Sequence, residues 1–115
     1  MTPAAIATVL GRVLLALLFV LAGAAKIAGP RPFLDHMKQA HVPGGFLPAV
    51  VVLEVGAGLA LAIGWRRMIA ADALSVFCLA TAAIFHRDLG NRVERTLFFK
   101  DIALAGALAM IATAS

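Results

Sequence analysis

Residues Pro3 to Ala28 read PAAIATVLGRVLLALLFVLAGAAKIA, an apolar run that is interrupted by a single arginine, Arg12. About 20 apolar residues in a helix cross the hydrocarbon core of a bilayer, so this run predicts a transmembrane helix. Its apolar core and small residues also resemble a signal peptide. Because the run extends back to Pro3, longer than a signal core needs, we expect a retained helix. Arg12 then lies roughly 13 Å along the helix, close to the middle of a bilayer core about 30 Å thick.

The composition extends this interpretation to the whole chain. Of 115 residues, 63% are hydrophobic and 14% are charged, and the mean hydropathy is +0.99. Ordinary soluble domains carry roughly 25% charged residues. We therefore predict an all-α, integral membrane four-helix transmembrane bundle that forms one domain over residues 1–115. The expected spans are residues 3–28, 46–63, 68–85 and 96–112.

Three connections separate these spans. The longest, from Pro30 to Gly45, has apolar residues at helical spacing and predicts a short amphipathic segment on the membrane surface. Gly64 to Arg67 predicts a tight hairpin, with a glycine at the helix end and a tryptophan at headgroup level. Arg87 to Arg95 is expected to be a short charged loop.

Several kinds of chemistry are disfavoured. The net charge of +4 suits basic membrane loops and does not indicate a nucleic-acid partner. Cys78 is the single cysteine, which excludes an internal disulfide, a CxxC redox pair and a cysteine-held cluster. Only one histidine, His86, lies at a span, at the far end of residues 68–85, so a haem with two histidine ligands is disfavoured. We expect no metal and no intrinsic cofactor, and any redox chemistry would use a borrowed one.

Depth along the helices indicates which charged side chains can meet. In a four-span chain, both termini and the Gly64 hairpin lie at the same end. Measured from that end, Glu54 is about 15 Å deep, level with Arg12, and Asp72 is roughly 6 to 8 Å deep. A central charge costs about 2.5 to 3.5 kcal/mol and normally pairs or lines a polar cavity. Arg12 thus has two candidate acids, and we expect it to pair with Glu54 at mid-membrane.

A second polar group is expected near the other end of the spans. The residues that approach a common depth there are Lys26, His86, Lys100 and Asp101. Intramembrane charges are candidates for function, although an ion pair that only fixes helix register gives the same pattern. Both interpretations stay open on the sequence alone.

The basic residues favour one orientation in a bacterial-type inner (plasma) membrane. The hairpin carries two arginines, Arg66 and Arg67. The longer connections and their flanks carry more, namely Lys26, Arg31, Lys38, Arg87, Arg92 and Arg95. Basic loops tend to stay in the cytoplasm, so both termini are predicted to face outside it.

The polar positions and the small-residue stretches together resemble the DoxX family of small four-helix membrane proteins, within the wider group that includes DoxD and MauE. The resemblance lies in GRVLLALLFVLAGAAKIAG (11–29), LEVGAGLALAIGWRRMIAADAL (53–74), Phe85-His86 and FFKDIALAGALAM (98–110). It implies a four-helix bundle in which recurring polar positions of the family are matched by Arg12, Lys26, Glu54, His86 and Lys100-Asp101. The family takes its name from the small subunit of a thiosulfate:quinone oxidoreductase, and other members are linked to redox enzyme assembly or oxidative-stress complexes.

Three functions are compatible with these observations. The first is a small membrane subunit of a larger, quinone-linked redox complex. Its quinone or proton site would comprise Arg12, Glu54, Asp72 and His86, because such side chains supply hydrogen bonds and proton relays. The second is a non-catalytic subunit that packs against a larger membrane complex or forms a homo-oligomer. The third is a small-molecule or lipid-binding membrane protein. Catalysis by the chain alone is not expected, because no nucleophile with a paired base is evident.

Overall fold

A computed structural model describes residues 2–86 and 89–113 of the chain, and every regular element within these ranges is helical. Four helices are long and apolar enough to cross a membrane, the second of them together with the turn η1 that precedes it. They are α1 (Pro3–Ala28), η1 (Gly44–Phe46) with α3 (Leu47–Ile63), α4 (Arg67–Phe85) and α5 (Arg92–Thr113). The short helix α2 (Arg31–Gln39) follows α1. The predicted fold class, an all-α transmembrane bundle, is confirmed.

Local interactions explain where α1 begins and where α3 ends. The Thr2 hydroxyl accepts a hydrogen bond of 3.1 Å from the Ala5 amide and caps α1. Gly64 ends α3 with a φ of +80°, a left-handed conformation that glycine adopts without steric cost. The chain then turns directly into α4.

Helix α5 begins at Arg92, four residues before the predicted start. Its first turn is capped by the Asn91 side-chain oxygen, which accepts hydrogen bonds from the amides of Val93, at 2.9 Å, and Glu94, at 3.2 Å. Such a cap satisfies donors that the helix itself leaves free. The last residues of the predicted charged loop are therefore helical.

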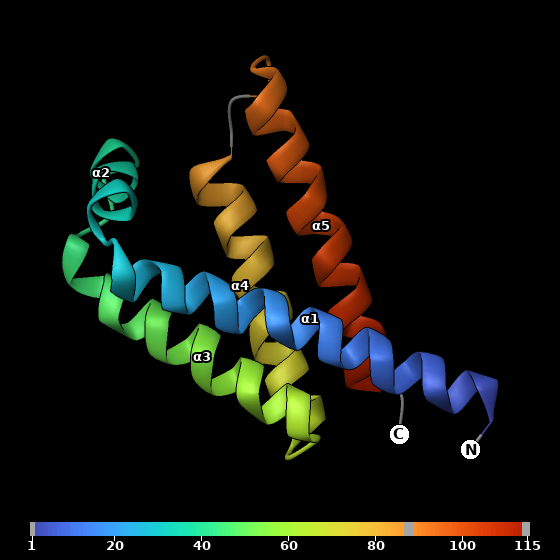
Figure 1. Ribbon diagram of the computed structural model, residues 1–115. Helices are drawn as coiled ribbons and strands as arrows, with labels where there is room; N and C mark the ends of the chain where they lie inside the picture. Colours follow the sequence, from blue (N-terminus) through green and yellow to red (C-terminus); the bar gives the residue numbers. More distant parts are fainter. Residues whose placement is uncertain (1, 87–88, 114–115) are drawn as a thin grey trace.

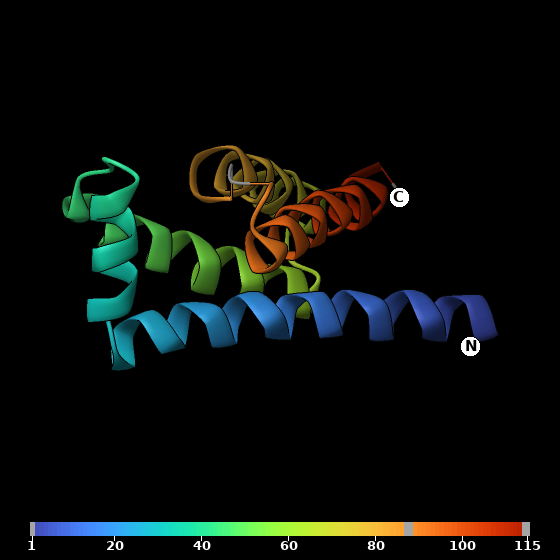
Figure 2. The ribbon, with the colours of Figure 1, turned by 90° about the horizontal axis from the view of Figure 1, so that it is seen from above.

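The spanning helices form two antiparallel pairs, α1 with α3 and α4 with α5. Figure 1 shows that the two pairs cross, and the view from above in Figure 2 shows the α4–α5 pair lying over the α1–α3 pair. Helices α3 and α4 connect the two layers. Helix α2 rises across one end of the α1–α3 pair (Figure 2).

Glycines bring α1 and α3 close together. A Cβ atom at Gly23 would lie 2.5 Å from Val55 Cγ2, and one at Gly58 would lie 3.0 Å from Val20 Cγ2. Small residues allow close backbone approach between helices in lipid, where van der Waals packing drives association. These two contacts fix the axial offset between α1 and α3.

The core lies between the two layers, and the outer faces are apolar. Leu61, Leu74 and Leu108 are fully buried, and the Ser75 hydroxyl donates a 3.0 Å hydrogen bond to the Ala105 carbonyl. Each spanning helix also exposes large apolar side chains, among them Leu14, Val52, Val76 and Met110. Apolar surface of this extent suits contact with lipid rather than water.

Candidate functional site

A cavity of about 350 Å³ lies between the two helix pairs, at the end where α2 crosses. Small-molecule sites generally span roughly 300 to 1,000 Å³. Its polar lining comprises Lys26, His36, Glu54, Thr81, His86, Lys100 and Asp101. Its apolar lining includes Leu18, Phe19, Phe77, Cys78 and Phe85. The cavity is thus apolar over most of its wall, with charged side chains from three helices, α1, α3 and α5.

An ion pair between Lys26 and Glu54 forms part of the cavity wall. Lys26 Nζ lies 2.7 Å from Glu54 Oε1, and the side chains are 15% and 3% exposed, respectively. The Lys26 ammonium group also lies 4.8 Å from the centroid of the Phe33 ring, an additional favourable contact. A charge this deeply buried needs a partner. The pair therefore joins α1 to α3 and places both an ammonium and a carboxylate group beside the cavity.

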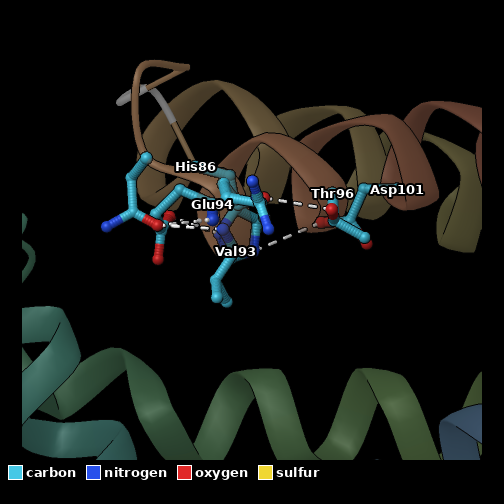
Figure 3. A network of polar contacts seen from close by, with 7 residues as sticks. His86, Val93, Glu94, Thr96 and Asp101 are labelled. Carbon is cyan, nitrogen blue, oxygen red and sulfur yellow. Dashed lines mark hydrogen bonds and ion pairs between the residues drawn. The ribbon is translucent and has the colours of Figure 1, made fainter.

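His86 lies at the end of α4 and faces two acids of α5 (Figure 3). Its Nδ1 atom is 2.9 Å from Glu94 Oε2, and its Nε2 atom is 3.5 Å from Asp101 Oδ2. Asp101 lines the cavity, whereas the Glu94 side chain is 25% exposed. An imidazole can accept a proton at one nitrogen and release one at the other. These three residues thus form a polar line, hereafter the His86 relay, between the cavity and the surface.

Helix α2 covers the cavity with one face. Phe33, His36 and Met37 lie on that face and contribute to the lining. The His36 ring packs edge-on against Phe85, at 5.2 Å between centroids, and against His86, at 6.1 Å. A second imidazole therefore lies close to the His86 relay, on a separate element.

The predicted pairing of Arg12 with Glu54 is wrong. A Cβ atom placed on Gly64 would lie 3.4 Å from Arg12 Nη2, so the guanidinium group lies at the far end of α3. Gly64 is about 15 Å from Glu54 along the helix axis. The prediction assumed that α1 begins level with the hairpin. Instead, the first turns of α1 extend past the end of α3 (Figure 1), which moves Lys26 to the level of Glu54.

The other predicted residues divide between the cavity and the outer surface. The cavity brings together Lys26, Glu54, His86, Lys100 and Asp101. Asp72 lies outside it: its side chain is exposed on α4, and no ion pair joins it to Arg12 within residues 2–86 and 89–113.

Two residues of the site, Glu94 and His36, escaped the sequence analysis. Glu94 precedes Asp101 by seven residues, which places both on one face of a helix, and this spacing is visible in the sequence. His36 shares the amphipathic face of Phe33 and Met37. Its proximity to His86 is a tertiary contact for which the sequence carries no signal.

Comparisons with known proteins show the family to which this chain belongs. The family model described as DoxX matches residues 7–87. The chain is also 33% identical, over 107 residues, to the inner membrane protein YqjF of Escherichia coli strain K12; the match covers 93% of this chain and 82% of that protein. No solved structure matches. The chain is a multi-pass membrane protein and belongs to the DoxX family, so the resemblance found in the sequence is confirmed.

Proposed function

We propose that this chain is a subunit of a larger, quinone-linked redox complex of the inner membrane, and that the cavity binds the quinone headgroup. The observation that supports this most directly is the placement of hydrogen-bond donors and a surface-connected relay in an otherwise apolar cavity. The relative in E. coli is named an inner membrane protein, which supports the location.

The chemistry of the cavity wall suits a quinone. Each quinone carbonyl oxygen accepts hydrogen bonds, and the Lys26 ammonium group and the His36 imidazole can donate them. The aromatic side chains of Phe19 and Phe77 offer apolar surface to the ring and the first part of its tail. A membrane-soluble ligand of this kind would reach the cavity from the lipid.

Reduction of a quinone to a quinol takes up two electrons and two protons. In this proposal, the partner protein supplies the electrons. The His86 relay delivers the protons, from Glu94 at the surface through the imidazole to Asp101 at the cavity. The connection from a partly exposed acid, Glu94, to a buried one, Asp101, is what distinguishes this arrangement from an isolated ion pair.

A purely structural subunit is the second candidate, and the Lys26–Glu54 ion pair favours it. That pair joins α1 to α3 whether or not the cavity is ever occupied. In such a protein, the outer apolar faces would pack against a larger membrane complex or another copy of the chain, and the cavity would have no ligand.

Cys78 provides the test, because it is the single cysteine of the chain and lines the cavity. A short-chain ubiquinone should slow the reaction of Cys78 with N-ethylmaleimide in the purified protein. The matched control carries Cys78→Ser and Leu14→Cys, which moves the thiol to the exposed face of α1. Ubiquinone should not change the rate at which this thiol reacts with N-ethylmaleimide. Equal labelling of Cys78 with and without the quinone, at saturating quinone concentrations, would contradict quinone binding.

A further inference from the structure

Three arginines gather at the end of the protein opposite the cavity. Arg66 lies in the turn between α3 and α4, and Arg67 is the first residue of α4. Arg12 lies against Gly64 in the same turn: a Cβ atom there would meet its Nη2, Cζ and Nη1 atoms at 3.4, 3.5 and 3.6 Å. These nearly equal distances mean that the guanidinium plane lies flat against the glycine. No ion pair involves any of the three within the part of the chain that the structure describes.

The guanidinium group of Arg12 lacks an acceptor for one of its donors. Its Nε atom is buried and has no hydrogen-bond partner among the described residues. A buried donor without an acceptor costs about 1 to 3 kcal/mol, and more when the group is charged. Anionic oxygens satisfy guanidinium groups well, because the planar fork of N–H donors matches two oxygens of a phosphate or carboxylate. Asp72, in the second turn of α4, is exposed and forms no ion pair with any residue that the structure describes.

The hairpin also combines charge with apolar surface. A second hollow is lined by Gly64, Arg66, Arg67, Met68 and Ile69. The apolar side chains of Met68 and Ile69 are 45% and 63% exposed. Arg66 adopts a left-handed φ of +47°, and its guanidinium group lies 5.0 Å from the Trp65 ring centroid. A left-handed conformation costs a residue with a Cβ atom about 1 to 2 kcal/mol. Other interactions of the hairpin must offset this cost at Arg66.

We propose that Arg12, Arg66 and Arg67 form a site for the headgroup of an anionic phospholipid such as phosphatidylglycerol. The phosphodiester oxygens accept hydrogen bonds from the guanidinium groups, and the acyl chains lie along Met68 and Ile69. A zwitterionic lipid would bring its own cation close to three arginines, which is electrostatically unfavourable. Free phosphate would gain nothing from the apolar part of the site. This proposal involves none of the cavity residues and is independent of the proposed function.

Native mass spectrometry of the delipidated protein in detergent tests the site by titration with phosphatidylglycerol and phosphatidylcholine. We expect tighter binding of phosphatidylglycerol, by about tenfold, and a loss of about tenfold in Arg12→Gln and in Arg66→Gln/Arg67→Gln, since these remove charge-assisted hydrogen bonds. The matched control, Arg92→Gln/Arg95→Gln, removes two exposed charges at the opposite end of the protein. It should change the affinity by less than about twofold. Circular dichroism monitors folding. If Arg12→Gln does not fold, the affinity of Arg66→Gln/Arg67→Gln for phosphatidylglycerol tests the proposal.

Three results would overturn the proposal. An equal loss in the control variant would mean diffuse attraction by net charge. Equal affinity for phosphatidylcholine would mean that the arginines do not select the headgroup. Binding of inorganic phosphate as tight as that of phosphatidylglycerol would mean an anion site without a lipid component.

Discussion

At the scale of single residues, the Lys26–Glu54 ion pair is the contact whose loss should matter most. Glu54 is the more deeply buried partner, 3% exposed against 15% for Lys26. Lys26→Gln therefore leaves a dry carboxylate group without a partner and should lower the free energy of unfolding by about 3 to 5 kcal/mol. Glu54→Gln should cost less, because the freed lysine can extend its ammonium group toward water. Unfolding in SDS, followed by circular dichroism, measures both.

The double variant Lys26→Gln/Glu54→Gln tests whether the two side chains stabilise the protein through their mutual contact or independently of each other. Its loss should be smaller than the sum of the two single losses, because the residues touch. Arg12→Gln combined with Glu54→Gln is the control and should give additive losses, since about 15 Å of helix separates them. Strong coupling of Arg12 to Glu54, with none for Lys26, would contradict the observed offset of the helices.

The same residues show what can be predicted from sequence about this site. The types of residue that line the cavity could be identified, because charged side chains inside apolar runs are conspicuous: Lys26, Glu54 and Asp101 were all singled out. Their partners could not be assigned. Depth counted from a helix end gives a level only if the two helices begin at a common plane, and Arg12 was misplaced because α1 begins beyond α3.

At the scale of elements, the packing of α1 on α3 depends on Gly58. A Cβ atom there would meet Val20 Cγ2 at 3.0 Å and the Ala16 carbonyl oxygen at 3.3 Å. Gly58→Ala should lower the free energy of unfolding by about 1 to 3 kcal/mol through overpacking. Gly56→Ala, two residues earlier on the same helix, meets nothing within 4 Å and should be neutral or stabilising by up to about 1 kcal/mol. If the two variants were equally stable, close approach at Gly58 would not be limiting.

The elements themselves were predictable to a greater extent than their arrangement. Long apolar runs must be helical in lipid because every backbone polar group needs an internal partner. The start of α5 was placed too late because the Asn91 cap was not considered. The crossing of the two helix pairs was not predictable, since contacts such as Gly23 with Val55 depend on which small-residue faces meet.

At the scale of the whole molecule, the orientation in the membrane is open to a direct test. Of the nine lysines and arginines that the structure describes, six lie toward the α2 end and three lie at the hairpin end. We therefore expect both termini outside the cytoplasm. In a Cys78→Ser background, Thr2→Cys should react with an impermeant maleimide added to intact cells, whereas Asn91→Cys should react only after the membrane is opened. Labelling of Asn91→Cys from outside would reverse the orientation.

The function of the molecule within a complex can be tested at Asp101. Asp101→Asn removes the proton acceptor at the cavity end of the His86 relay. It should lower quinol formation by the co-purified complex about a hundredfold, within the range that general acid–base groups contribute, while assembly is unchanged. Glu94→Asn should have a smaller effect, because water can reach this partly exposed position and replace the lost carboxylate. A complex that falls apart while its remaining assembled fraction turns over normally would favour the structural subunit.

The unequal lengths of α1 and α3 have a consequence for the bilayer around the protein. Helix α1 has 26 residues and is about 39 Å long, whereas α3 has 17 residues and is about 25 Å long. To fit a hydrocarbon core of about 30 Å, α1 must tilt to roughly 40°, the upper limit of the common range. The second span, η1 with α3, has 20 residues and is about 30 Å long; because it packs along α1 it tilts as well and then covers only about 23 Å of the bilayer's thickness. The membrane beside the hairpin should therefore be thinner than elsewhere, which would favour short acyl chains at that point.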